Sequence, residues 1–292
     1  MRARAGTAVW ETGDGPPVLL VHGFPDHPEG LFALATELAA SGYRCLLPAL
    51  PGYAPSEPAP DGDYSGAAVG EDLISVLDSL KIESAAYVGH DWGAELGYPL
   101  LAQHPERFTC MVGIAAPHPS GYAVRRTDVA ELRTAWYAMF LAYVPGAAQI
   151  AQHPDWLRGL VRSWSPTLRW EEWPAIAEWL CRPGVMEAVS AYYRANLDAP
   201  PAAPVVPVPT TIIHGSADGC IGPAAYPDFS RFFPAGVEVH ELAGVGELER
   251  EQIVQVAEFA ALGRAGVERR GLAQQRIVGL ELARAGGGGG EE

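Results

Sequence analysis

Short apolar runs alternate with segments of helical hydrophobic spacing along most of the chain. The runs at residues 17–21 and 85–88 contain no charged residue, as expected for strands that are buried on both faces of a sheet. Residues 31–40 and 66–80, which lie between these runs, carry apolar side chains at helical spacing. This alternation predicts a mostly parallel, doubly wound α/β sheet.

Other strands are expected on both sides of this core, and one long segment breaks the pattern. The further strands are expected at residues 7–11, 43–47, 108–115, 211–215 and 237–242. From about residue 120 to residue 198 the apolar spacing is helical instead, and aromatic residues become frequent. Six of the eight tryptophans fall there, namely Trp136, Trp156, Trp164, Trp170, Trp173 and Trp179.

These patterns divide the chain into three parts. Residues 1–119 and 200–265 are expected to form the sheet-containing core, and residues 120–199 a helical domain inserted into it. The proline-rich stretch at 200–209 is the expected return linker. Residues 266–292 form an extension whose glycine-rich end is expected to be disordered.

Composition supports a globular enzyme and argues against several kinds of partner. The 292 residues are 48% hydrophobic, enough to bury a full core. The net charge of −15 argues against a nucleic acid or an anionic membrane as partner. No apolar stretch is long enough to span a bilayer. No apolar segment follows the basic first residues, so no secretion signal is expected and a cytoplasmic location is predicted.

The four cysteines are isolated in the sequence and form no Cys-x-x-Cys pair. Cys45, Cys110, Cys181 and Cys220 are expected to be small buried side chains in a reducing compartment. No metal site and no other cofactor are predicted.

The candidate chemistry centres on the sequence Tyr-Val-Gly-His-Asp-Trp-Gly-Ala at residues 87–94. An apolar strand ends in Gly89, Asp91 and Gly93, and a helix-compatible segment follows. This is the Gly-x-nucleophile-x-Gly elbow of hydrolases, with Asp91 where many of them carry serine. A carboxylate nucleophile attacks carbon and forms an alkyl-enzyme ester, so epoxides and halogenated carbons are the suitable electrophiles. The backbone N–H of Trp92 is the expected oxyanion-hole donor.

A second motif, His-Gly-Phe-Pro, follows the buried run at 17–21, and the backbone N–H of Phe24 in it is the expected second donor. Together with Gly-His-Asp-Trp-Gly, it resembles the epoxide hydrolases, which are related to the dehalogenases within the α/β-hydrolase fold superfamily. Residues 50–56, Leu-Pro-Gly-Tyr-Ala-Pro-Ser, are similar to the family's Asp-x-x-Gly-Tyr-Gly-x-Ser segment, with Ala49 in the place of the first acid. The resemblance implies an α/β-hydrolase fold whose helical cap is inserted after the sixth strand.

In the family, two cap tyrosines donate hydrogen bonds to the epoxide oxygen. The sequence Ala-Tyr-Tyr-Arg-Ala at 191–195 resembles the family segment that carries one of them, which implies this role for Tyr193. The other precedes a Pro-Gly pair, here at 145–146, and Tyr137 fits best while Tyr143 remains the alternative. The further residues expected to line the substrate site are His22, Pro25, Trp136, Tyr143 and Tyr192.

The resemblance also implies a triad acid and a base. Asp218, just past the strand at 211–215, takes the position of the acid. The family's histidine after the last strand is absent, and Glu247 stands in the shortened gap. Among the other histidines, His240 and His118 are the nearest substitutes, although neither occupies the expected loop.

Three hypotheses follow from the missing histidine. Glu247 acts as the base in its place, or the site opens and isomerises or cyclises its substrate without hydrolysis, or the protein binds a ligand without catalysis. The expected function is the opening of an epoxide, or a similarly activated carbon, in a small hydrophobic organic substrate. A role in secondary metabolism accords with the departure from the family pattern. The sequence leaves a homodimer open.

Overall fold

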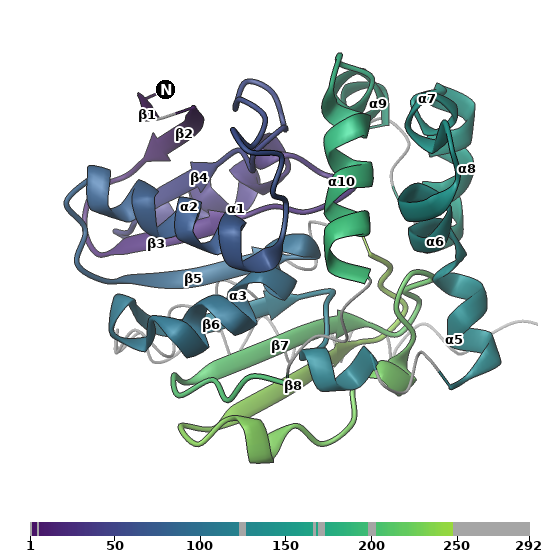
Figure 1. The fold of residues 1–292 in the computed structure, drawn as a ribbon. Coiled ribbons are helices and arrows are strands. Elements are labelled where there is room, and N and C mark those ends of the chain that lie inside the picture. Colours follow the sequence, from purple (N-terminus) through teal and green to yellow (C-terminus); the bar gives the residue numbers. More distant parts are fainter. Residues whose placement is uncertain are drawn as a thin grey trace, which may run out of the picture.

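The computed structural model describes residues 2–4, 6–122, 127–165, 168, 173–197 and 203–247. Within these residues, eight strands form one sheet in the order β1-β2-β4-β3-β5-β6-β7-β8 (Figure 1). The strands are β1 (Arg2–Arg4), β2 (Thr7–Thr12), β3 (Pro17–Val21), β4 (Arg44–Pro48), β5 (Ala85–His90), β6 (Phe108–Ile114), β7 (Thr210–Gly215) and β8 (Val237–Leu242). Only β1 with β2 and β2 with β4 pair antiparallel, so the predicted mostly parallel sheet is confirmed.

Every strand expected from the apolar pattern is present, and its ends differ from the expected ones by two residues at most. The sheet also contains β1, which was not predicted. Its sequence Arg-Ala-Arg carries no run of apolar residues, and the strand forms through its pairing with β2, where Arg2 faces Val9. The tail at 266–292 and the core residues after 247 lie outside the described residues.

Strand β3 shows how the sheet is buried on both faces. Leu19 and Val21 pack into one hydrophobic cluster, and Val18 and Leu20 into another, because successive side chains of a strand point to opposite faces. Helices α2 (Gly66–Ser79) and α3 (Trp92–Gln103) contribute to the first cluster. Helix α1 (Phe32–Ala40) contributes to the second, so the sheet lies between two helical layers.

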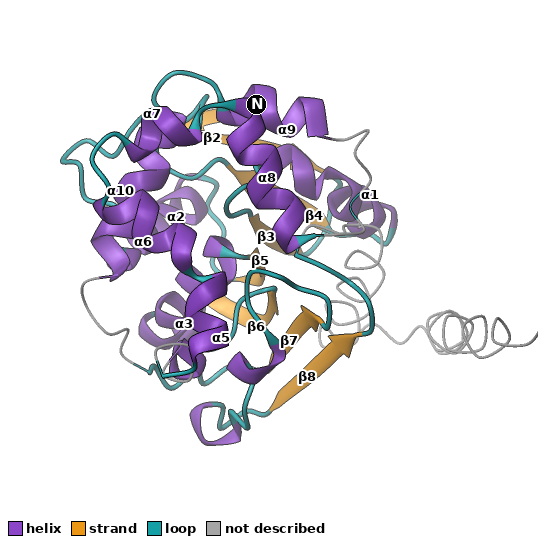
Figure 2. Ribbon diagram, turned by 90° about the vertical axis from the view of Figure 1, so that its right-hand side faces the viewer, coloured by secondary structure: helices purple, strands orange, loops and turns teal. Residues whose placement is uncertain are grey.

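The described residues between β6 and β7 contain six α-helices, which we call the inserted helices. They are α5 (Val129–Thr134), α6 (Trp136–Tyr143), α7 (Ala147–Ala151), α8 (Pro154–Trp164), α9 (Trp173–Leu180) and α10 (Val185–Leu197). They gather on one side of the molecule in Figure 1, and Figure 2 looks onto that side. Phe24, just after β3, contacts Trp164 of α8 and Tyr193 of α10, so these helices cover the carboxyl ends of the strands.

Two further expectations can be compared with the described residues. None of the described helices is long and apolar enough to cross a membrane. Cys45, Cys110 and Cys220 are buried as expected, whereas Cys181 is partly exposed and its thiol donates to the carbonyl of Gln152.

The turn between β5 and α3 leaves no room for side chains beside Asp91. A Cβ on Gly93 would lie 2.1 Å from the carbonyl oxygen of Val21, and a Cβ on Gly89 would lie 2.4 Å from the carbonyl carbon of Gly93. Both contacts are with backbone, which cannot move aside as a flexible side chain can. The glycines of the elbow therefore let α3 pack directly against the end of β3.

We expect Gly93→Ala to lower the free energy of unfolding by about 1–3 kcal/mol or more, because the new methyl group overlaps the β3 backbone. The matched control is Gly159→Ala in α8, where a Cβ meets nothing within 4 Å. That variant is expected to gain about 0.5–1 kcal/mol from helix propensity. Urea unfolding midpoints measure both changes, and a loss of equal size in both variants would contradict the packing described for the elbow.

Candidate active site

Asp91 lies at the N-terminus of α3 with a backbone conformation that few residues other than glycine adopt. Its φ is 51° and its ψ is −119°, and its amide donates to the carbonyl of Ile114 on β6 at 3.0 Å. Positive φ is costly for a residue with a side chain, and it persists where the surrounding structure enforces it. The Asp91 side chain is thereby held at the carboxyl end of β5, where it is only 5% exposed.

The Asp91 carboxylate is held by backbone amides from the loop after β3 and from the first residue of α3. The N–H of Phe24 donates to its Oδ1 at 2.6 Å, and the amide of Trp92 adds a second hydrogen-bonding contribution. Gly23 makes the approach possible, because a Cβ there would lie 2.2 Å from the same oxygen. The two backbone donors expected from the motifs are therefore brought together at Asp91.

Burial sets the protonation of Asp91. It raises the pKa of this carboxyl well above its usual range, and the negative charge of Glu95 raises it further. The amides of Phe24 and Trp92 oppose this shift, and the charge of Asp218 adds to it. The ionised form is thus stabilised mainly by the two backbone amides.

Two tyrosines of the inserted helices lie next to this part of the sheet, Tyr193 beside Asp91 and Tyr137 against Tyr193. The Tyr193 ring of α10 lies 5.1 Å from the Trp92 ring, and the Tyr137 ring of α6 lies 5.7 Å from Tyr193 at an angle of 90°. Both are buried, with exposures of 5% and 4%. Burial raises the pKa of Tyr193 well above its usual range, and the neighbouring Tyr137 and Asp91 raise it further. Its hydroxyl therefore stays protonated and able to donate. We call Phe24, Asp91, Trp92, Tyr137 and Tyr193 the Asp91 site.

A group of buried polar side chains adjoins this site. Asp218 follows β7, and its Oδ1 accepts from the amides of Cys220 at 2.7 Å and Ile221 at 3.0 Å. The thiol of Cys220 lies 3.0 Å from the Tyr137 hydroxyl. One ligand atom each of Asp218, Cys220 and Glu247 lies within 4.8 Å of the other two, which is a donor set that a divalent ion can accept.

Glu247, the residue in the gap left by the family histidine, is buried at 1% exposure. The Nε2 of His90 lies 3.5 Å from its Oε1 and 3.1 Å from its backbone carbonyl oxygen. His90 precedes Asp91, so Glu247 is tied to the elbow strand. The structure thus places a carboxylate, rather than an imidazole, beside Asp218.

Two residues expected to line the substrate site are not brought to it. Trp136 and Tyr143 are 47% and 45% exposed, and the Trp136 ring packs against Phe140 and Trp156. Successive residues of an α-helix are about 100° apart around its axis, so the turn of α6 that buries Tyr137 directs Trp136 and Tyr143 outward. Their role as substrate-binding residues therefore stays a prediction, and Tyr137 is the tyrosine of α6 that packs against Tyr193.

Three other expected lining residues lie close to the site. His22 is fully buried, and its Nε2 accepts from the amide of Leu50 at 3.1 Å. Burial lowers the pKa of His22 to about 4, which keeps the ring neutral. The Tyr192 hydroxyl donates to the carbonyl of Pro51 at 3.2 Å. Both side chains therefore fasten the loop after β4, while Pro25 is buried directly after Phe24.

Neither substitute histidine occupies a position suited to a base. His240 lies within β8 with its side chain 41% exposed, and its Nε2 is 3.6 Å from Glu238. The Nε2 of His118 is 2.9 Å from the carbonyl of Pro204, and burial lowers the pKa of His118 to about 4. These contacts assign His240 to the sheet and His118 to the junction of the core with the inserted helices.

Two residues of the site were not singled out from the sequence. Cys220 contacts Tyr137 from the loop after β7, in which Asp218 alone was predicted to belong to the site. Tyr53 is fully buried, and its ring lies 4.7 Å from His22 and 6.0 Å from Tyr192. The signal for Tyr53 in the sequence is the Gly-Tyr pair in residues 50–56, which is shared with the family segment.

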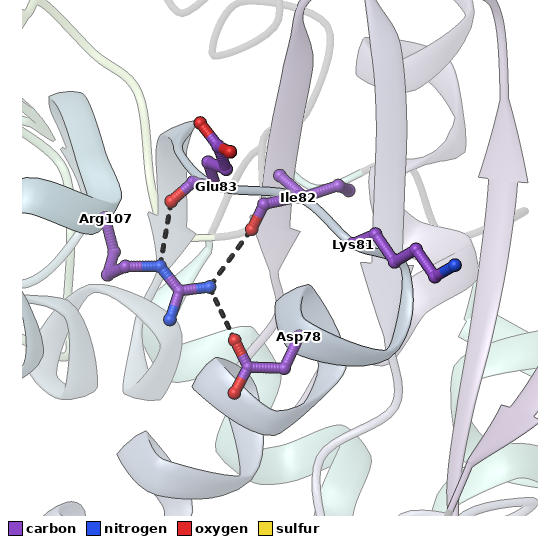
Figure 3. Close-up of a pocket in the computed structure, with 5 residues that line it drawn as sticks. All are labelled: Asp78, Lys81, Ile82, Glu83 and Arg107. Atoms are coloured by element: carbon purple, nitrogen blue, oxygen red, sulfur yellow. Dashed lines mark hydrogen bonds and ion pairs between the residues drawn. The ribbon is translucent and has the colours of Figure 1, made fainter.

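A surface pocket of about 440 Å³ lies near the amino-terminal ends of β5 and β6, opposite the strand ends that carry the site (Figure 3). Arg107 spans it, donating to the carbonyls of Glu83 and Ile82 at 2.8 and 3.0 Å and to Asp78 at 2.8 Å. These bonds tie the end of α2 to the start of β6. The pocket is far from the strand ends that carry Asp91, and its arginine is engaged in holding the loop.

The sheet, the elbow and the aspartate within it define the class of protein as an α/β hydrolase. A model of the α/β hydrolase fold family matches residues 16–248. The chain belongs to this family.

Individual relatives show which members of this family the chain is similar to. An epoxide hydrolase from Caballeronia sordidicola is 41% identical over 110 residues, a match that covers 37% of this chain and 33% of that protein. A 2-hydroxymuconate semialdehyde hydrolase from Pseudomonas putida is 29% identical over 273 residues, 88% of each chain. This chain therefore matches about a third of the length of its epoxide hydrolase relative.

Solved structures show the same fold across nearly the whole chain. The epoxide hydrolase of Bacillus megaterium, solved with an inhibitor, has a TM-score of 0.76 at 21% identity, covering 88% of this chain and 96% of that one. The epoxide hydrolase of Vigna radiata has a TM-score of 0.70 at 22% identity, covering 88% and 93%. The predicted α/β-hydrolase fold, similar to that of epoxide hydrolases, is confirmed.

The raised pKa of Asp91 gives a prediction for stability. Between the ordinary value of 3.8 and the raised value, the folded protein keeps a proton that the unfolded chain has lost. Stability therefore falls as the pH rises through this window. Asp91→Asn removes the titration, so the variant is expected to exceed the wild type in Tm at about pH 8 and to approach it near about pH 4. If the Tm values of the two proteins changed in parallel with pH, that would contradict the raised pKa of Asp91.

Proposed function

We propose that this protein opens the epoxide ring of a hydrophobic organic molecule through attack of the Asp91 carboxylate on carbon. The observation that carries the proposal is the arrangement of the Asp91 site. Backbone donors hold the carboxylate from the side of the sheet, and on the side of the inserted helices Tyr193 packs against Trp92, with Tyr137 against Tyr193. The inserted helices would act as the cap that closes the site.

In the first step, an Asp91 oxygen forms a bond to one epoxide carbon as the carbon–oxygen bond of the ring breaks. The electron pair of that bond goes to the epoxide oxygen, which takes a proton from the Tyr193 or Tyr137 hydroxyl. A protonated phenol suits this task because it neutralises the alkoxide as it develops. The high pKa of Tyr193 keeps this proton available.

In the second step, water attacks the ester carbonyl carbon, and negative charge develops on the oxygen that accepts from Phe24. Backbone amides that point at this oxygen before the reaction stabilise that charge without having to reorganise. The water proton needs an acceptor. Glu247, which lies beside Asp218 and His90, is the residue we assign to it. Collapse of the intermediate breaks the bond between the carbonyl carbon and the substrate oxygen, which takes the proton from Glu247 and leaves as the second hydroxyl of the diol. The proton left on the Asp91 carboxyl returns to the tyrosine that donated in the first step. Carboxylates act as general bases toward water in other hydrolases.

The surroundings of the site favour an apolar substrate. Phe24, Trp92 and Trp164 present aromatic rings around Tyr137 and Tyr193. Rings of this kind bury the apolar body of a ligand, while the few polar groups fix its orientation. A substrate from secondary metabolism is consistent with this lining and with the replacement of the family histidine.

A first experiment follows the covalent intermediate. Incubation with styrene oxide is expected to add the mass of one substrate molecule to the wild type, at Asp91, because no imidazole speeds the hydrolysis of the ester. Asp91→Asn should acquire no adduct. Glu247→Gln should keep the adduct longer, with diol formation slower by about 10²- to 10⁴-fold, the usual contribution of a general base. Intact-mass spectrometry and diol quantification measure both.

The same experiment separates the alternatives. Formation of an isomer that takes up no oxygen from labelled water would assign a non-hydrolytic reaction. A protein that forms neither adduct nor product, yet is stabilised against heat by its ligand, would be a binding protein. Undiminished diol formation by Glu247→Gln would remove Glu247 from the mechanism.

A second experiment tests the phenol donor. Tyr193→Phe is expected to slow epoxide opening by about 10²- to 10⁴-fold, because the alkoxide loses its proton source. Tyr192→Phe is the matched control, since its hydroxyl bonds to the Pro51 carbonyl. That variant should lose about 0.5–1.5 kcal/mol of stability and keep its rate. Single-turnover rates and urea midpoints distinguish the two, and equal rates in both variants would return Tyr193 to a packing role.

A further inference from the structure

Tyr53 carries a buried hydroxyl that the steps above do not use. It lies in the loop after β4 and is 0% exposed. Among the residues that the structure describes, its hydroxyl oxygen has no hydrogen-bond partner. A buried hydroxyl without a partner is destabilising, and such a group is usually satisfied by a ligand or by solvent.

The position of Tyr53 joins it to the Asp91 site. Its ring lies 4.7 Å from His22, which precedes the Gly23–Phe24 turn, and is stacked 5.8 Å from Trp179 of α9. It also lies 6.0 Å from Tyr192, the neighbour of Tyr193 in the chain. Tyr53 therefore lies between the strand ends and the inserted helices, on the side of the site formed by the β3 and β4 loops.

The electrostatics agree with this placement. Burial raises the pKa of Tyr53 well above its usual range, and the charges of Asp91 and Asp26 raise it further. The hydroxyl therefore stays protonated and able to donate, and Tyr53 lies close enough to Asp91 and Tyr193 to interact with both electrostatically.

We propose that Tyr53 is a specificity-determining residue whose hydroxyl donates a hydrogen bond to a second oxygen of the substrate, one next to the epoxide carbons. The preferred substrate class is then an epoxide with an adjacent ether, hydroxyl or carbonyl oxygen. This inference rests on the proposed epoxide chemistry for the identity of the ligand, and its test uses equilibrium binding so that the two can fail separately.

The chain offers a matched control. Tyr43 also has a buried hydroxyl without a hydrogen-bond partner among the described residues. It belongs to the hydrophobic cluster that contains α1, on the opposite face of the sheet from the cluster of Tyr53. Replacing either tyrosine with phenylalanine removes one oxygen and no bond within the protein, so both variants should be at least as stable as the wild type.

The experiment measures the binding of two diols that differ by one atom. In 3-phenoxypropane-1,2-diol an ether oxygen is attached to the carbon next to the diol, and in 4-phenylbutane-1,2-diol a methylene group takes the place of that oxygen. The wild type is expected to bind the ether diol more tightly. Tyr53→Phe should weaken its binding by about 2- to 12-fold, the range for one hydrogen bond, and leave the other diol unchanged. Tyr43→Phe should bind both as the wild type does. Isothermal titration calorimetry gives the dissociation constants.

Equal affinity of the wild type for the two diols, or equal weakening of both by Tyr53→Phe, would overturn the proposal. Kinetics with the two corresponding epoxides add a second readout, in which Tyr53→Phe should raise KM for the ether epoxide and leave kcat unchanged. An equal fall of kcat for both epoxides would instead assign Tyr53 to the water step and also overturn the proposal. If the wild type converts neither epoxide, the proposed chemistry fails while the diol comparison still decides the role of Tyr53.

Discussion

The hydrogen bond from the Phe24 amide to Asp91 Oδ1 is the interaction on which the site depends. It spans 2.6 Å between the loops that follow two adjacent strands, β3 and β5. It can form only because Gly23 leaves space for the carboxylate, and because Gly93 lets α3 begin against the end of β3. The same contact fixes one carboxylate oxygen and compensates in part for the burial that disfavours its charge. Without this close approach of two loops, the buried Asp91 carboxyl group would lose the hydrogen bond that orients its Oδ1 atom.

Much of the fold, and the half of the site that lies on the sheet, could be predicted from local sequence. Apolar runs identify buried strands because both faces of the sheet are covered, and the glycines around Asp91 specify a turn that other residues cannot make. The positions of Phe24, Trp92 and Asp218 follow from strand ends, which meet at one edge of a parallel sheet. The sequence shows that Glu247 stands in the gap left by the family histidine. Its contact with His90, however, depends on the approach of the loop after β8 to β5.

The half of the site on the inserted helices was harder to predict, because the rotation of a helix decides which side chains face inward. Tyr137 and Trp136 are neighbours in sequence, yet one is buried against Tyr193 and the other is half exposed. Tyr192 and Tyr193 divide in a similar way, one bonding to the loop after β4 and the other facing Asp91. Motif resemblance identifies the segment, and only packing against the sheet selects the residue within it. Strand β1 was missed because its sequence has no apolar run and the strand is recognised by its pairing with β2.

If Tyr137 donates to the substrate as proposed, its contact with the Cys220 thiol bears on how that substrate binds. A thiol is a weak hydrogen-bond donor and a weak acceptor, so it orients the phenol without binding it strongly. An incoming oxygen atom then competes with sulfur for the phenol and displaces a poor partner rather than a good one. Serine at position 220 would be a stronger competitor, and would hold the phenol away from an arriving ligand. Beside Tyr137 the softness of sulfur thus allows the phenol to be ordered at rest and still available to exchange partners.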